Sequence, residues 1–279
     1  MSPPGHPKGE YRSAQHEGTS MSLEASAAFS PLERLDGRVA VIAGGTGAIG
    51  IASAHRLAAL GAHCVLLHRQ PTPDAADALA ASLPGSGHLA VQASITDSAT
   101  LHAAAALVQA RFGHVHILVN SAGYTQAVPP ADLEALSDEL IDEMLQVNFR
   151  GVVATIRAFV PLLKASGDGL IVNVSSIAGF TGQGSNLGYV AAKAAIDVVG
   201  DALARVLAPA VRVLTISPGV IDSGFVPGRG ADFNAKAAAS MPLRRVGTVD
   251  DVAAAVQACA TTLRYATGTR IVVDGGRHL

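Results

Sequence analysis

The amino-acid sequence predicts an α/β fold: a single Rossmann-type, doubly wound domain in which helices flank a seven-stranded parallel sheet. The chain has 279 residues, 49% of them apolar, which is enough for one large core. From Arg38 onward, short apolar runs alternate with longer amphipathic ones, as in repeated βα units. A glycine-rich turn joins the first apolar run to the first amphipathic run, which is typical of the first unit of such a sheet.

The first 33 residues differ from the rest in composition. They begin with a stretch rich in Pro and Gly and continue with polar residues, without an apolar run long enough for a signal-peptide core. We expect a disordered leader over residues 1–33 and the Rossmann-fold domain over residues 34–279. Met21 is an alternative start of the chain, which the sequence leaves open.

Hydrophobic periodicity predicts the remaining elements in order. Buried strands are expected at seven short runs rich in Val, Ile, Leu and Ala, at about Arg38–Ala43, His63–His68, His88–Ala93, Val115–Asn120, Leu170–Val174, Val211–Ser217 and Arg270–Val273. Helices rich in Ala and Leu are expected between them, at about Ala48–Leu60, Asp74–Ser82, Ser98–Phe112, Asp132–Ala165, Gly188–Leu207 and Val249–Arg264.

The turn after the first strand reads Gly-Gly-Thr-Gly-Ala-Ile-Gly over residues 44–50. It satisfies the expression G-x-G-x-x-G and opens a helix, so it presents a helix N-terminus at which a pyrophosphate can bind. In a chain with 29 glycines this match alone is weak. A tight strand-to-helix turn without a ligand is the plain alternative.

Three further residues have the character of a proton-transfer site. Tyr189 and Lys193 lie four residues apart at the start of a predicted helix, so the ammonium lies on the face of the phenol and lowers its pKa. Ser176 follows the predicted strand Leu170–Val174, where open α/β sheets place their sites, and its hydroxyl can bind a substrate carbonyl. The alternatives are a solvated helix face for the pair and a turn cap for Ser176.

With these residues in this order, the chain resembles the short-chain dehydrogenase/reductase family, in its compact branch. The resemblance runs from about Leu35 to Gly276. Further segments carry it, namely Asn120-Ser121-Ala122-Gly123, Val147-Asn148-Phe149-Arg150-Gly151, Ser217-Pro218-Gly219, Arg245–Val252 and Val273-Asp274-Gly275-Gly276.

The resemblance implies an oxidoreductase that interconverts a carbonyl and a secondary alcohol by hydride transfer with a nicotinamide cofactor. Tyr189 would be the general acid/base, Lys193 would hold the nicotinamide ribose, Ser176 would orient the carbonyl, and Asn148 would offer its backbone carbonyl to a water chain. Cofactor contacts would come from Gly44, Thr46, Gly47, Ile49, Gly50, His68, Arg69, Ser94, Ile95, Asn120, Ala122, Gly123, Tyr189, Lys193, Pro218, Gly219, Ile221 and Ser223.

Charge at the end of the second predicted strand favours NADP(H) over NAD(H). His68 stands where an NAD enzyme commonly has a carboxylate for the ribose hydroxyl, and Arg69 follows it and can pair with a 2′-phosphate. A solvated surface position is the alternative for Arg69. Ser94 replaces the usual Asp that meets adenine, so contacts there are expected to be weaker or to come from the backbone.

Departures from the family pattern keep other functions open. Ala43 and Ala48 replace a Thr and the middle Gly of the glycine motif, and the result also resembles the extended branch of the family. An extended-branch epimerase or dehydratase therefore stays as an alternative. So does a non-catalytic NADP(H)-sensing Rossmann protein, although it would have little need for Ser176, Tyr189 and Lys193.

Composition narrows the partners to small molecules. Charged residues make up 15% of the chain and the net charge is -2, so neither a nucleic acid nor a membrane surface is expected as a partner. Cys64 and Cys259 are expected to be buried and free in a cytoplasmic protein, and no metal site is expected. The resemblance implies a homotetramer or homodimer. Asp222–Met241 has the composition of a mobile lid over a largely apolar substrate.

Overall fold

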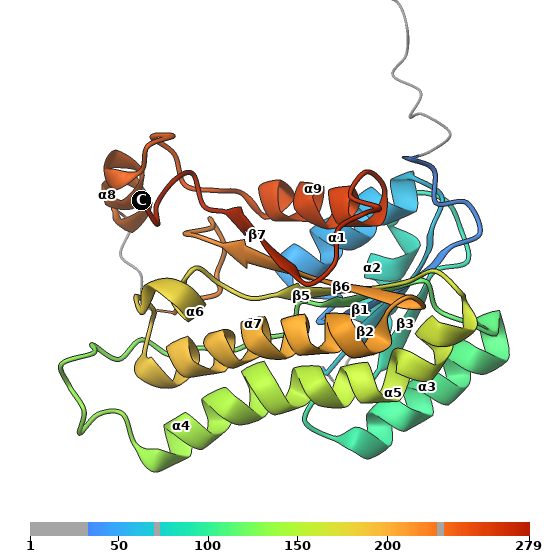
Figure 1. The fold of residues 1–279 in the computed structure, drawn as a ribbon, viewed down its shortest axis with the longest axis horizontal. Coiled ribbons are helices and arrows are strands. Elements are labelled where there is room, and N and C mark those ends of the chain that lie inside the picture. The colour runs from blue at the N-terminus through green and yellow to red at the C-terminus, as the bar shows by residue number, and fades with distance from the viewer. Residues whose placement is uncertain (1–32, 70–72, 228–231) are drawn as a thin grey trace, which may run out of the picture.

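The computed structural model describes residues 33–69, 73–227 and 232–279 (Figure 1). All but the last residue of the predicted leader therefore lies outside the described residues. Seven parallel strands form one sheet in the order β3-β2-β1-β4-β5-β6-β7, which confirms the predicted fold class. Because the chain runs from β1 outward to β3 and then returns to β4, the two directions of winding part between β1 and β4. Doubly wound sheets bind ligands at that point.

The strands agree closely with the predicted runs. They are β1 Val39–Ala43, β2 His63–His68, β3 Leu89–Gln92, β4 Ile117–Asn120, β5 Gly169–Val174, β6 Val211–Pro218 and β7 Thr269–Val273. Their carboxyl ends are aligned, since Ala43 lies opposite both Leu67 and Asn120, and Asn120 lies opposite Asn173. The loops that follow these strands therefore meet along one edge of the sheet.

Helices cover both faces of the sheet (Figure 1). One face carries α1 (Ala48–Ala59), α2 (Pro73–Ala81) and α9 (Val249–Ala260), and the other carries α3 (Ser98–Phe112), α5 (Gly151–Ala165) and α7 (Leu187–Leu207). Side-chain caps begin several of them. Thr248 and Asp251 form a reciprocal capping box at the start of α9, and Asp97 accepts a hydrogen bond from the Ala99 amide at the start of α3.

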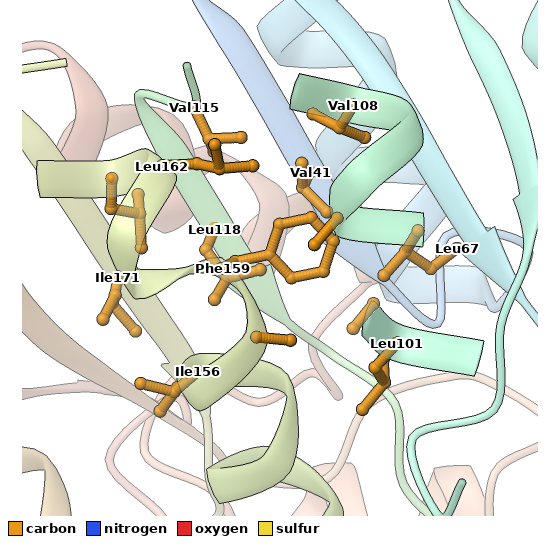
Figure 2. Close-up of a cluster of buried hydrophobic side chains, with 14 of the residues drawn as sticks. Val41, Leu67, Leu101, Val108, Val115, Leu118, Ile156, Phe159, Leu162 and Ile171 are labelled. Carbon is orange, nitrogen blue, oxygen red and sulfur yellow. The ribbon is translucent and has the colours of Figure 1, made fainter. Parts of the chain in front are cut away.

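Alternation along the buried strands divides the core into two clusters. Val39, Val41 and Ala43 face α3, α5 and α7, whereas Ala40 and Ile42 face α1, α2 and α9. Figure 2 shows the first cluster, in which the Phe159 ring of α5 lies among side chains from the sheet and from α3. Helices thus pack against the sheet from both sides, and this packing fixes the positions of the carboxyl ends of the strands.

The predicted helix over Asp132–Ala165 is wrong in its first part and interrupted in its second. The Ser137 hydroxyl accepts a hydrogen bond from the Leu140 amide, so α4 (Asp138–Leu145) begins only there. The chain then widens into a π-helical turn, η2 (Gln146–Arg150), before α5. Amphipathic periodicity continues through both features and does not show them.

Two short helices were not predicted, and one predicted helix ends early. The two short helices are α6 (Ala178–Thr181) and α8 (Phe233–Ser240). Helix α9 stops at Ala260 rather than at the predicted Arg264. Figure 1 shows α6, α8 and the C-terminus at the same end of the molecule. In the part of the chain that the structure describes, no helix is both long and apolar enough to cross a membrane.

Candidate active site

The glycine turn between β1 and α1 is built without room for side chains. Gly44 has a φ of +74°, and a Cβ there would lie 2.7 Å from the Ala122 backbone. A Cβ on Gly50 would overlap the Gly44 carbonyl oxygen, which lies directly beneath it. Gly47 begins α1 without a side-chain cap, and the first turn holds no acidic residue. The amides that open α1 are therefore placed to bind an anion.

Helix α7 supplies Tyr189 and Lys193 from a firmly capped start. The Asn186 side-chain oxygen accepts a hydrogen bond of 2.7 Å from the Tyr189 amide, which begins the helix three residues before the phenol. The Tyr189 side chain is 8% exposed, and its ring lies 6.1 Å from that of Phe225 between centroids. The predicted spacing does place the ammonium beside the phenol, because Lys193 Nζ lies 5.5 Å from the centre of the Tyr189 ring.

Lys193 carries its charge in the interior of the protein. Its side chain is buried, and Nζ donates a hydrogen bond of 2.9 Å to the Val174 carbonyl at the end of β5. Burial lowers the pKa of Lys193 from 10.5 to about 8, and the nearby Asp197 carboxylate offsets part of that effect. The Ser175 hydroxyl donates to the Lys193 carbonyl, so β5 and α7 are joined at the site.

Ser176 lies directly after β5, where the sequence placed it. Its Oγ accepts a hydrogen bond of 3.1 Å from the Ala178 amide, and α6 begins at that turn. The Ser176 hydroxyl therefore does cap a turn, which was the alternative to a role in binding a substrate carbonyl. A hydroxyl that accepts through oxygen still has its proton to donate, so this cap leaves Ser176 able to bind a carbonyl.

One cavity of about 1490 Å³ opens along the edge of carboxyl ends and brings the predicted residues together. The predicted residues that line it are Gly44, Thr46, Gly47, Ile49, Gly50, His68, Arg69, Ser94, Ile95, Ala122, Gly123, Ser176, Tyr189, Lys193, Pro218, Gly219, Ile221 and Ser223. Its described lining contains no Asp or Glu, while His68, Arg69, Lys193, Arg277 and His278 contribute basic side chains.

Asn148 and Asn120 are not among the described residues that line this cavity. Asn148 is fully buried in η2, where its side chain accepts from the Tyr124 amide and donates to the Tyr124 and Met144 carbonyls. Asn120 donates to the Asn173 side chain at 2.9 Å beneath the cavity. Asn148 is thus placed to hold the chain after β4, and Asn120 to join β4 to β5.

A network of side chains links α7 to β7, α6 and the C-terminal tail. The buried Asp197 carboxylate of α7 pairs with Arg270 of β7 at 2.9 Å, and the Arg270 guanidinium lies 4.7 Å above the Phe180 ring. The Phe180 and His278 rings pack edge to face, with 5.8 Å between their centroids. Only Asp197 left a signal in the sequence, because it stands one turn after Lys193 on the same helix face.

No metal centre accompanies these groups in the described part of the chain. Among residues 33–69, 73–227 and 232–279, no three His, Cys, Asp or Glu side chains gather to form a candidate metal site. Both Cys64 and Cys259 are buried free thiols, and burial raises the pKa of each to about 12.

Comparison with known proteins gives the family. A family model described as enoyl-(acyl carrier protein) reductase matches residues 43–278. Granaticin polyketide synthase ketoacyl reductase 2 of Streptomyces violaceoruber is 37% identical over 245 residues, 86% of this chain and 96% of the relative. The chain belongs to the short-chain dehydrogenase/reductase family. This short-chain dehydrogenase/reductase is also 33% identical to cis-4-hydroxycyclohexanecarboxylate dehydrogenase of Sinomonas cyclohexanicum over 86% of this chain and 96% of the relative.

Solved structures of the family share the fold over nearly their whole length. The crystal structure of a short-chain dehydrogenase/reductase from Brucella melitensis, described as a glucose/ribitol dehydrogenase, has a TM-score of 0.82 at 30% identity. It covers 88% of this chain and 98% of its own. The match confirms the compact branch. Members of the family are oxidoreductases that act on carbonyl or alcohol substrates with NAD(P)(H).

Proposed function

We propose that this short-chain dehydrogenase/reductase is an NADP(H)-dependent enzyme that interconverts a carbonyl and a secondary alcohol, with Tyr189 as general acid/base. One observation carries the proposal: Tyr189, Ser176 and Lys193 line the same cavity as the uncapped glycine turn. Tyr189 and Lys193 come from α7 and Ser176 from the turn after β5, and they converge where parallel sheets place their chemistry.

The residues of the chain have separate roles in this reaction. In the direction of reduction, Ser176 donates a hydrogen bond to the substrate carbonyl and Tyr189 gives its proton to the same oxygen. Lys193 holds positive charge beside the phenol and favours the phenolate that remains. NADP(H), when bound, supplies the hydride in this direction and accepts it in the other. Asn148 would offer its backbone carbonyl to the water chain that reaches Lys193, while its side chain holds the Tyr124 segment.

The cavity suits NADP(H) in its charge and its backbone. The opening amides of α1 and the side chain of Thr46 would hold the pyrophosphate, while Arg69 and His68 would meet the 2′-phosphate. A carboxylate at the end of β2 would favour the free ribose hydroxyl of NAD(H), but none lines the described cavity. The remaining predicted contacts come from the ends of β3, β4 and β6 and from Tyr189 and Lys193 of α7, where Lys193 would hold the nicotinamide ribose.

The setting of the enzyme is part of the same proposal. The names of two relatives describe a ketoacyl reductase and a ring-alcohol dehydrogenase, which supports a small organic carbonyl or alcohol as substrate. We extend the proposal to a homotetramer or homodimer in the cytoplasm. The buried free thiols Cys64 and Cys259 agree with a reducing compartment.

The test compares a panel of ketones with NADPH and with NADH, in the wild-type protein and in Tyr189→Phe. Wild type should consume NADPH with at least one ketone, and Tyr189→Phe should lower kcat by about 10²–10⁴-fold with little change in the Kd of NADPH. Tyr265→Phe is the matched control, because the Tyr265 side chain is fully exposed and outside the cavity lining.

The cofactor choice has its own variant. Arg69→Glu should lower kcat/KM for NADPH by about a hundredfold and leave that for NADH nearly unchanged, because the carboxylate repels only the 2′-phosphate. A several-fold preference of the wild type for NADH would refute the NADP(H) assignment. Near-normal turnover by Tyr189→Phe would refute the role of Tyr189.

A further inference from the structure

The part of the cavity lined by α6, α8 and the C-terminal tail, which lie at the same end of the molecule (Figure 1), is aromatic and basic. We define this outer end by Phe180, Phe225, Phe233, Arg277 and His278, which come from α6, from the segment before α8, from α8 and from the C-terminal tail. Phe180 and Phe225 are 38% and 40% exposed and both line the cavity, so part of each side chain is accessible to a ligand. The outer end therefore combines apolar surface with positive charge.

The tail that carries Arg277 is fixed in place. The Asp274 carboxylate accepts hydrogen bonds from the Gly276 and His278 amides and from His278 Nδ1 at 2.7 Å. A Cβ on Gly276 would lie 2.7 Å from Pro242, so the tail packs tightly against the segment after α8. The position of Arg277 at the cavity wall is thus set by its neighbours on both sides.

Side-chain contacts also link the tail to α7, the helix that carries Tyr189 and Lys193. His278 packs against Phe180, Phe180 lies under Arg270, and Arg270 pairs with Asp197 of α7. Asp197 stands one turn beyond Lys193. The same network that holds α6 and the tail therefore reaches the helix that carries Tyr189.

The Arg277 guanidinium has no carboxylate partner among the described residues. Within the described part of the chain, its guanidinium makes a single side-chain hydrogen bond, a long one of 3.4 Å from Nη1 to the Ser240 hydroxyl. By contrast, Arg245 and Arg270 nearby are each paired with an aspartate. Arg277 is thus an exposed cation without a carboxylate partner, in a wall whose described residues include no carboxylate, and such a cation favours an anionic ligand group.

We propose that the outer end binds an anionic group of the substrate, with Arg277 as its partner and the Phe180 and Phe225 rings against the carbon skeleton between that group and the reacting carbonyl. The inference rests on the proposed function and names its substrate class: an apolar ketone or alcohol that carries a carboxylate or a phosphate away from the reacting carbon. Both groups present the oxygens that a guanidinium binds.

The test uses two substrate pairs that keep the reacting carbonyl and change only the charge. The first is 4-oxocyclohexanecarboxylate and its methyl ester, and the second is acetoacetyl-coenzyme A and the acetoacetyl thioester of N-acetylcysteamine. The wild type should prefer the anionic member of one pair by about tenfold or more in kcat/KM. Arg277→Gln should remove that preference through KM, with the neutral member unaffected, and Arg277→Lys should restore part of it.

A binding measurement separates this inference from the proposed function. Calorimetry with NADP⁺ present compares cyclohexanecarboxylate with its amide, and phosphopantetheine with pantetheine, in wild type and Arg277→Gln. Tighter binding of one anion, lost in the variant, supports the inference even if no ketone is turned over. Equal affinities within both pairs, or an anion preference that survives Arg277→Gln, overturn it. Arg111→Gln is the control for net charge, because Arg111 lies at the far end of α3 and outside the cavity lining.

Discussion

A buried ammonium such as that of Lys193 loses the hydration that it has in the unfolded chain. The Val174 carbonyl and the Asp197 carboxylate return part of that loss, and the pKa still falls from 10.5 to about 8. The proton on Lys193 is therefore held weakly at the place where the proposed reaction needs it. At this scale the site is defined by how little water reaches the ammonium, since the side chain is 4% exposed.

Replacement of Lys193 by Met tests this burial through the pH dependence of stability. Between pH 8 and 10.5 the unfolded chain holds a proton on Lys193 that the folded chain has lost, so the contribution of Lys193 to the free energy of unfolding rises with pH. Below pH 8 the full penalty remains, on the order of 3 kcal/mol. Lys193→Met should therefore be inactive yet more stable than wild type at pH 7, with a gap that narrows from pH 8 to 10.5.

Denaturant unfolding at several pH values measures the gap. The raised pKa values of Cys64 and Cys259 act with the opposite sign above pH 9, but both proteins keep these thiols, so their effect cancels in the difference. The exposed Lys164 gives the control variant Lys164→Met, which removes no charge from the interior. A gap that stays constant with pH would show that Lys193 titrates alike in the folded and unfolded chains.

At the scale of single elements, strands were predicted well because each is a short run rich in apolar residues, and those in the middle of the sheet are buried on both faces. β1 is buried at every position, and its sequence Val-Ala-Val-Ile-Ala has no polar residue that could mislead. Helix boundaries were harder to predict from the sequence. The start of α4 depends on the Ser137 cap, and the π turn depends on the bonds between Asn148 and Tyr124, which lies in another part of the chain.

The glycine turn shows how much an element can depend on one missing methyl group. Gly50→Ala places a Cβ against the Gly44 carbonyl, whereas Gly47→Ala brings it no closer than 3.2 Å to that atom. Gly50→Ala should lower the free energy of unfolding by about 3 kcal/mol or more and weaken NADP(H) binding, because backbone must move.

Thermal unfolding of the apoprotein and a cofactor titration check this expectation. Gly47→Ala is the matched variant and should cost about 1 kcal/mol or less, as for a glycine lost from a helix N-cap. Equal stability losses in the two variants would mean that the turn relaxes around Gly50, and that the close approach to Gly44 is not what holds it.

The arrangement of the whole molecule explains why only part of the site could be predicted from the sequence. Tyr189, Lys193 and Ser176 lie in motifs of fixed spacing, so their convergence followed from the order of strands. The partners that tune them follow from sheet register and helix packing instead. Arg270 reaches Asp197 because β7 is the last strand beside β6, and His278 reaches Phe180 because the tail turns at Asp274. No local pattern in the sequence indicates contacts across such separations.

Both core clusters share the same strands, and the site lies at the carboxyl ends of those strands. Loss of packing far from the cavity should therefore lower the free energy of unfolding while kcat changes little. Phe159 is among the largest fully buried side chains and lies in the cluster of Figure 2. Phe159→Ala should lower the free energy of unfolding by about 3–5 kcal/mol and Tm by about 10 °C or more, with kcat at 25 °C nearly unchanged. Phe159→Leu should cost clearly less, because it leaves a smaller cavity.

Calorimetry should show one transition in each variant. The helices on both faces of the sheet pack against the same strands, so neither face can unfold while the other stays folded. Two separate transitions, or an inactive protein that is still folded at 25 °C, would mean that the two faces are independent and that the cluster around Phe159 shapes the site directly.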